Sequence, residues 1–455
     1  MARSAVTGQL PIKGPYRELR LANDEHAAFY VIPFDEDGVC SGPLTRDDLL
    51  RRLPADEPTD VFLFSHGWNN TWPTALARYE DFLSGFAELE VEYTLGRAFR
   101  PLLIGVFWPS AVLVAAHEQA PQIAAEAVGT ADDVAAVARA LPLDRRVRFY
   151  ALAEQPQLSG DETVELADIL TGLWGEDSAT DDLGPQAGAL APEDLVEVWS
   201  RLEDAATPPE TQEFDASSFG FGGDEPSNVG SAEPQAAGAR DRLRKLSPRN
   251  LIRGTTVWMM KDRAGRVGST GVHSLLTDVL SATAAPVHLI GHSYGGKIVL
   301  SALCAGPLPR PVDSVLLLQG AMSRLCFSPD VPGLGGPGGY RTALSRVRLP
   351  ILATFSRHDH PLTRDFHLAL RRKSDLGEVV IAGAENSRYS ALGGFGPGEL
   401  GTEAKVVPAQ DPGQRYELNG RERVIGIDAS QVISGHGDVS NRWTWWMLLN
   451  QVGEV

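Results

Sequence analysis

The run G-H-S-Y-G at residues 291–295 places Ser293 between two glycines, in a pattern that could present a nucleophilic hydroxyl. A chain with 46 glycines among 455 residues often contains a bare G-x-S-x-G by chance, so the motif alone is weak evidence. Its surroundings are more informative, because the strand-like run 287–290 precedes it and the helically spaced apolar run 297–303 follows it. This context predicts a serine on a strained strand–turn–helix corner, where Gly291 and Gly295 avoid collisions. A purely structural serine at a Gly-rich corner is the alternative.

A serine hydroxyl becomes a good nucleophile only when a base removes its proton and an acid orients that base. Four histidines follow Ser293, and the last of them, His436, lies in the run G-H-G-D. This run comes after the last predicted strand and just before the terminal helix, and its glycines leave the loop able to present the imidazole. We therefore predict that His436 is the base. The alternative is a turn histidine beside the potential helix caps Asp438 and Ser440.

The acid should follow the apolar run 350–356, and Asp359 stands just beyond it in the run H-D-H-P. The neighbours His358 and His360 raise the alternative of a metal site. Adjacent residues of an extended chain point to opposite sides, however, and no third clustered ligand is visible in the sequence. We therefore predict Asp359 as the acid and no metal. Asp365, inside the following predicted helix, is the second candidate for the acid.

A tetrahedral intermediate needs backbone N–H donors for its negative oxygen. One donor should be the N–H of Tyr294, which directly follows the serine. The other should come from the loop after an early strand, and the run H-G-W at His66, Gly67 and Trp68 stands there. Gly67 allows a tight turn, so we expect the N–H of Trp68 to face the site. A packed turn with an aromatic plug is the alternative.

The elements that must position these residues alternate along both ends of the chain. Apolar runs predict strands at 27–35, 59–68, 101–110, 287–290, 313–321, 350–356, 377–383 and 422–430. Amphipathic patterns predict helices at 45–53, 72–90, 273–284, 297–305, 340–347, 364–372 and 441–452. Buried strands that are each followed by a polar turn and a helix favour a mostly parallel sheet covered on both faces. We therefore predict an α/β fold.

The alternation stops between residues 115 and 250, where the patterns are helical and acidic. We expect residues 1–114 and 251–455 to form the two parts of one core, and 115–250 to form a helical insertion that acts as a cap or lid. Residues 205–240 are rich in Pro, Gly, Ser and acid, and we expect them to be mobile or disordered. The apolar stripe of Leu166, Ile169 and Leu170 lines an acyl pocket in one interpretation and packs into the core in the other.

The net charge of −18 comes from the insertion. Residues 154–238 hold 20 acidic residues and one basic residue, and the rest of the chain is nearly neutral. This acidity disfavours nucleic acid as a partner, because phosphates would be repelled. Residues 240–266 hold nine basic and two acidic residues. We interpret them as neutralising the insertion or as a solvated face, in preference to a nucleic-acid site.

Cysteine content and hydropathy indicate the compartment. Cys40, Cys304 and Cys326 are odd in number and widely spaced, which is typical of thiols in a reducing environment. The first 20 residues lack the apolar core of a signal peptide, and no run approaches 18 apolar residues. We therefore expect a soluble, cytoplasmic protein without a membrane span.

The motifs H-G-W-N-N, F-W-P-S, G-H-S-Y-G-G, H-D-H-P and G-H-G-D-V-S-N occur in an order that resembles the α/β-hydrolase superfamily. The chain looks most like bacterial serine-esterase-like members with an HGF or HGW oxyanion loop, over roughly residues 25–114 and 251–450. This resemblance implies a nucleophile, an acid and a base at Ser293, Asp359 and His436. It implies oxyanion donors at Trp68 and Tyr294, with supporting turns at His66, Gly67, Gly291 and Gly295.

The function that the resemblance implies is cleavage of a carboxylic ester through an acyl-enzyme intermediate, without a cofactor. The substrate would be a small-molecule ester, with an apolar acyl group as one form. An amidase or a thioesterase would use the same residues. The alternative from another class is a non-catalytic α/β-hydrolase scaffold that binds a protein partner through its acidic insertion.

Overall fold

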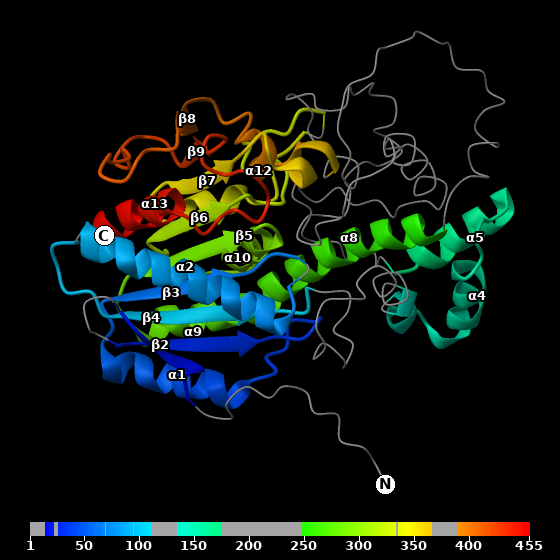
Figure 1. Ribbon diagram of the computed structural model, residues 1–455, viewed down its shortest axis with the longest axis horizontal. Helices are drawn as coiled ribbons and strands as arrows, with labels where there is room; N and C mark the ends of the chain where they lie inside the picture. Colours follow the sequence, from blue (N-terminus) through cyan, green and yellow to red (C-terminus); the bar gives the residue numbers. More distant parts are fainter. Residues whose placement is uncertain are drawn as a thin grey trace.

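A computed structural model of the chain describes residues 14–21, 26–68, 70–93, 95–110, 134–135, 137–173, 248–333, 335–365 and 390–455. Its centre is a nine-stranded sheet in the order β1-β2-β4-β3-β5-β6-β7-β9-β8 (Figure 1). Every neighbouring pair is parallel except β1 and β2. The mostly parallel sheet confirms the α/β prediction. The strands are β1 (Arg17–Arg20), β2 (His26–Pro33), β3 (Asp60–Ser65), β4 (Pro101–Phe107), β5 (Val287–His292), β6 (Ser314–Leu318), β7 (Ile351–Phe355), β8 (Ala404–Pro408) and β9 (Val424–Asp428).

The central strands are apolar at nearly every position because both faces of the sheet are covered. All residues of β3, β5 and β6 are buried. Successive side chains of a strand point to opposite faces, so Leu289 packs into one apolar layer and Ile290 into the other. The continuous apolar runs in the sequence are therefore the pattern of a sheet buried between two layers of helices.

Different helices cover the two faces. The layer that contains Leu289 also contains residues of α1 (Pro43–Asp56), α8 (Pro248–Val267), α9 (His273–Ala282) and α10 (Tyr294–Cys304). The layer that contains Ile290 holds α2 (Trp72–Glu92) and α13 (Arg442–Gly453). The shorter helical segments are η1 (Gly268–Val272), η2 (Arg341–Ser345), η3 (Pro361–Asp365), α12 (Leu392–Phe395) and η5 (Gly401–Glu403).

The order of the strands defines where a site can form. From β3 the chain crosses to β4 on one side, whereas from β5 it crosses to β6 on the other side. In open α/β sheets, ligands bind beyond the carboxyl ends of the strands at such a switch point. The residues that directly follow β3 and β5 are His66 and Ser293. The topology therefore places the two most conspicuous sequence motifs side by side.

The described part of the expected insertion is helical. Helices α4 (Leu143–Ala153) and α5 (Gly160–Thr171) pack against each other and against α8, which projects beyond the carboxyl ends of the central strands (Figure 1). The stripe of Leu166, Ile169 and Leu170 is buried in the same apolar layer as Leu289, which favours the core interpretation of these residues. The tract 205–240, expected to be mobile, lies outside the described residues.

The sequence patterns and the observed elements differ in several places. The segment 340–347, expected to be a helix, contains only the short 3₁₀ segment η2, and the sequence did not predict β1, β8 or the helix α8. The strand expected at 377–383, and most of the helix expected at 364–372, lie outside the described residues. No helix in the described part of the chain combines the length and the hydropathy needed to cross a membrane.

Candidate active site

Ser293 stands at the sharp corner between β5 and α10. Its φ of 55° lies in the left-handed region, which a residue with a side chain rarely adopts. Its neighbours explain why the corner needs glycine on both sides. A Cβ at Gly291 would lie 2.5 Å from the Cα of Gly296, and a Cβ at Gly295 would lie 2.0 Å from the carbonyl oxygen of Ser65. The corner thus stores backbone strain at the serine, as strained residues at functional sites commonly do.

The structure brings the three predicted catalytic side chains into one hydrogen-bonded chain. The Nε2 atom of His436 lies 2.9 Å from the Oγ atom of Ser293, and its Nδ1 atom lies 2.8 Å from Oδ2 of Asp359. Because the carboxylate can only accept, neutral His436 carries its proton on Nδ1, and Nε2 is left to accept from the hydroxyl. This tautomer is the one that a general base for Ser293 requires.

Asp359 is the only buried residue of the run H-D-H. It is fully buried after β7, whereas His358 and His360 are exposed. The Oδ1 atom of Asp359 accepts from the N–H of Leu362 at 3.1 Å, and its Oδ2 atom also accepts from Nε2 of Gln319 at 3.0 Å. The side chain of Asp359 is therefore directed into the protein, whereas those of His358 and His360 are at the surface. No group of three or more metal-ligating side chains occurs within the described residues.

The loop that carries His436 is fixed from both ends. The side chain of Asn441 caps α13, accepting from the N–H groups of Trp443 and Thr444 at 3.2 and 3.1 Å. Asp438 holds the other end, accepting from the N–H and hydroxyl of Ser434 at 2.9 and 2.8 Å. The cap of α13 is therefore Asn441, and neither Asp438 nor Ser440 has that role.

His292, just before Ser293, also holds this loop, and the sequence analysis missed it. Its Nε2–H donates to the backbone carbonyl of His436 at 2.8 Å, and the two rings lie 5.0 Å apart. Burial, together with the repulsion that a protonated His436 and the guanidinium of Arg78 would exert, keeps the pKa of His292 well below its usual range. A neutral His292 therefore supports the His436 loop. The only sequence signal is its place next to Ser293.

The loop after β3 passes against Ser293. A Cβ at Gly67 would lie 2.7 Å from the Cβ of Ser293, so only glycine fits there. The carbonyl of Gly67 accepts from Nδ2 of Asn70 at 3.0 Å and lies 2.9 Å from Nδ1 of His66. In a planar trans peptide the N–H points opposite to the preceding carbonyl. The N–H of Trp68 is therefore directed away from His66 and Asn70.

His66 is buried in this loop as a neutral ring. It stacks on Trp108, with ring centroids 5.7 Å apart, and its Nε2 accepts from the N–H of Trp108 at 3.4 Å. Burial lowers the pKa of His66 to about 4 from its usual 6.5. Both ring nitrogens have backbone partners, so His66 acts on the shape of the loop and does not face Ser293.

The low pKa of His66 predicts a loss of stability in mild acid. Between pH 6.5 and pH 4 the unfolded chain binds a proton that the folded His66 does not, so the free energy of unfolding falls as the pH is lowered through this window. At pH 5 this group alone accounts for a loss of about 2 kcal/mol relative to pH 7.5. A His66→Asn variant keeps a donor near the position of Nδ1 but cannot bind this proton. In urea titrations, its free energy of unfolding should fall by about 2 kcal/mol less than that of the wild-type chain between pH 7.5 and pH 5. Equal losses in the two proteins would contradict the assignment.

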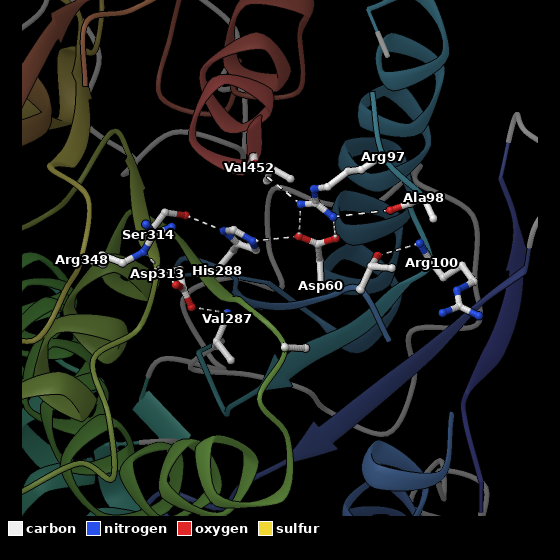
Figure 2. Close-up of polar contacts among 12 residues, drawn as sticks. Asp60, Arg97, Ala98, Arg100, Val287, His288, Asp313, Ser314, Arg348 and Val452 are labelled. Carbon is white, nitrogen blue, oxygen red and sulfur yellow. Dashed lines mark hydrogen bonds and ion pairs between the residues drawn. The ribbon is translucent and has the colours of Figure 1, made fainter. Parts of the chain in front are cut away.

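A second cluster of buried polar groups lies at the opposite, amino-terminal end of the central strands (Figure 2). Asp60 and His288 are fully buried, and Nε2 of His288 lies 3.3 Å from Oδ1 of Asp60. Nδ1 of His288 lies 2.8 Å from Oγ of Ser314, and Arg97 binds both carboxylate oxygens of Asp60 at 2.7 Å. Burial by itself would raise the pKa of Asp60, but the hydrogen bonds from Arg97 and His288 outweigh it and hold the pKa at about 2.

This cluster joins segments that are far apart in the sequence. Asp60 begins β3, His288 lies in β5 and Ser314 begins β6. Arg97 precedes β4 and also lies 3.4 Å from the carbonyl of Val452 in α13. The cluster therefore ties three central strands to the terminal helix. The sequence analysis did not predict it.

Comparisons of the chain with family models, with curated proteins and with solved structures return no match. The site is therefore interpreted from its own geometry.

Proposed function

We propose that the chain is a serine hydrolase of the α/β-hydrolase type that cleaves a carboxylic ester. One observation carries the proposal: the hydrogen-bonded chain from Ser293 through His436 to Asp359, at 2.9 and 2.8 Å. The nucleophile stands on a strained corner at the switch point of a parallel sheet, which adds support. The resemblance of the motifs to the superfamily agrees with this arrangement.

The proposed reaction has two acyl-transfer steps. His436 takes the proton of Ser293 on Nε2 while the Oγ atom attacks the ester carbonyl, and the alcohol leaves with that proton. Nε2 then takes a proton from water as the water oxygen attacks the acyl-enzyme, and it returns this proton to Oγ of Ser293 when the acyl–Oγ bond breaks and the acid leaves. Asp359 holds the proton of Nδ1 in place and stabilises the imidazolium that forms in each step. This sequence needs no metal or organic cofactor.

The proposed oxyanion donors are the N–H groups of Tyr294 and Trp68. Tyr294 directly follows Ser293 and is the first residue of α10, so its N–H belongs to the helix N-terminus beside the serine, where backbone N–H groups favour negative charge. The N–H of Trp68 points away from the side chains that hold the carbonyl of Gly67, and Gly67 lies against Ser293. These features favour a donor pair beside the attacking oxygen.

The proposal also covers the role of the insertion and the cellular compartment of the protein. The helices α4 and α5 extend with α8 beyond the sheet, and we propose that the insertion caps the site (Figure 1). All three cysteines are free, which fits a reducing compartment such as the cytoplasm. The competing scaffold hypothesis rests on the acidic insertion, most of which lies outside the described residues.

Labelling with a fluorophosphonate probe tests the proposal directly. The wild-type chain is expected to be labelled, and both the Ser293→Ala and the His436→Ala variants are expected to lose the label, because the reaction needs the hydroxyl and its base. Folding of each variant is checked by thermal melting. A folded wild-type chain that does not react would contradict the enzyme and favour the scaffold.

Turnover of matched substrates separates the classes of hydrolase. We expect p-nitrophenyl acetate to be hydrolysed faster than p-nitroacetanilide and than an acetyl thioester. A preference for the anilide or for the thioester would instead indicate an amidase or a thioesterase. A p-nitrophenyl ester series of increasing chain length would then define the acyl group.

A further inference from the structure

Gln319 follows β6 directly and has an unusual backbone conformation. Its φ is 44°, in the left-handed region that residues with side chains avoid, and the residue is fully buried. Such a backbone conformation is strained and persists only where surrounding contacts enforce it. Ser293 also has a positive φ, and it too follows a described strand and contacts a member of the Asp359–His436 pair. Contacts between Gln319 and the Ser293–His436–Asp359 site would therefore explain how this backbone conformation is held.

Its side-chain amide is hydrogen-bonded in one defined orientation. The Oε1 atom accepts from the hydroxyl of Thr354 at 2.9 Å, and the same hydroxyl oxygen accepts from the backbone N–H of Gln319 at 2.9 Å. The Nε2 atom faces two groups that can only accept, Oδ2 of Asp359 at 3.0 Å and the carbonyl of Gly393 at 3.2 Å. The amide is thereby fixed with its NH₂ group toward the carboxylate.

The oxygen that Gln319 contacts is the one that His436 uses. Oδ2 of Asp359 accepts from Nε2 of Gln319 and from Nδ1 of His436, while Oδ1 accepts from the N–H of Leu362. A carboxylate with donors on both oxygens cannot rotate about its Cβ–Cγ bond without losing charge-assisted hydrogen bonds. Gln319 adds to the bonds from Leu362 and His436 a donor that does not move with the imidazole. It thereby helps to hold the plane of the carboxylate, and that plane sets the direction from which the imidazole is held.

We propose that Gln319 is a positioning residue for catalysis, acting through Asp359. The inference rests on the hydrolase function proposed above. Gln319 does not contact the reacting atoms, so its loss should lower kcat and leave KM nearly unchanged. A hydrogen bond to a charged group contributes enough to change the rate by roughly 10- to 100-fold.

A Gln319→Leu variant tests this role because leucine keeps most of the volume and removes the donor. We expect its kcat for p-nitrophenyl acetate, and its rate constant for fluorophosphonate labelling, to fall by roughly 10- to 100-fold with a similar KM. Gln451→Leu is the matched control. Gln451 is equally buried and also donates to two carbonyls, of Val315 and Pro350, but it lies in α13 away from Asp359. The control should lose stability and keep its kcat.

A Gln319→Glu variant gives a second readout that a packing role would not change. Its carboxyl group would retain the bond from Thr354 and face Asp359, with His436 as the next titratable group in the chain of contacts. Two adjacent carboxylates disfavour their shared ionisation, whereas a protonated glutamic acid could donate as the amide does. The labelling rate of the variant relative to wild type should therefore rise as the pH falls from 8 to 6.

The outcomes separate this role from the hydrolase function. A reactive wild-type chain with an unchanged Gln319→Leu rate, or a pH-independent ratio for Gln319→Glu, would overturn the role of Gln319 alone. Equal losses of kcat in the Gln319→Leu and Gln451→Leu variants would also overturn it, because they would indicate a general packing effect. A folded wild-type chain that neither labels nor turns over ester would overturn both proposals.

Discussion

An Asp359→Asn variant is expected to hydrolyse p-nitrophenyl acetate roughly 10⁴-fold more slowly than the wild-type chain, the scale of loss when the orienting aspartate of a Ser–His–Asp enzyme is replaced. The reason lies in the donors around the side chain. Oδ1 of Asp359 accepts from Leu362, and Oδ2 accepts from Gln319 and His436. An asparagine has one oxygen and one NH₂ group, so either orientation sets its NH₂ group against a donor.

Each orientation of the asparagine weakens the base. If its NH₂ group faces His436, the ring must accept on Nδ1, and Nε2 then carries the proton and cannot take one from Ser293. If its oxygen faces His436, the tautomer survives but the negative charge that stabilises the imidazolium is gone. Both effects act on kcat, and KM should change little.

The matched variant is Asp365→Asn, which removes the other candidate acid at the end of η3. It is expected to keep the wild-type rate. Kinetics with p-nitrophenyl acetate on the two purified variants, after thermal melting has confirmed their folding, make the comparison. A wild-type rate in Asp359→Asn together with a large loss in Asp365→Asn would show that the acid was assigned to the wrong residue.

An Asp60→Asn variant should lower the free energy of unfolding by about 3 to 5 kcal/mol, the range for breaking a buried ion pair from one side. Asp60 is fully buried, and Arg97 binds both of its oxygens at 2.7 Å. The asparagine keeps the volume and removes the charge, which leaves the guanidinium of Arg97 without its counter-ion in a partly buried place. His288 loses an ionised partner in the same change.

The chain provides a control in an arginine–carboxylate pair at its surface. Arg442 binds both oxygens of Glu92 at 2.9 and 2.8 Å, but both side chains are about half exposed. A Glu92→Gln variant should therefore lose much less stability than Asp60→Asn, because solvent screens the exposed pair. Urea titrations followed by circular dichroism give both values. Similar losses in the two variants would contradict the argument that burial gives the Asp60 pair its importance.

The residues of the candidate site could be identified from the sequence because each lies in the loop or turn that follows a buried strand. Ser293, Asp359 and His436 are polar residues just beyond buried apolar runs, and the carboxyl ends of parallel strands share one edge of the sheet. Glycines beside Ser293 and His436 mark the sharp turns. Local pattern and topology together were therefore sufficient to bring these residues to one place.

The supporting residues could not be identified in this way. Gln319 ends an apolar run, and its role depends on a positive φ and on the partners Thr354 and Gly393, which the sequence does not reveal. His292 looks like any residue of the serine motif until its bond to the carbonyl of His436 is known. Both roles are set by rotamers and long-range contacts, which local propensity does not determine.

The edges of the fold were also less predictable than its centre. The short strand β1 and the half-exposed strand β8 lack the continuous apolar runs of the buried strands. The basic content of residues 240–266 concealed the helix α8, because its charge pattern suggested a solvated face. Burial on both sides makes a strand conspicuous in the sequence, and elements without it give a weaker signal.

The cluster in Figure 2 means that a Ser–His–Asp arrangement lies at each end of β5, which holds His288 of one and is followed by Ser293 of the other. A search by residue type and distance would find both. At the amino end, however, Ser314, His288 and Asp60 are fully buried, and Arg97 already neutralises the carboxylate. No ester carbonyl can reach that hydroxyl, so the arrangement there can only fasten strands together. Solvent access and competing charge therefore distinguish a Ser–His–Asp cluster that only stabilises the sheet from the one for which we propose catalysis.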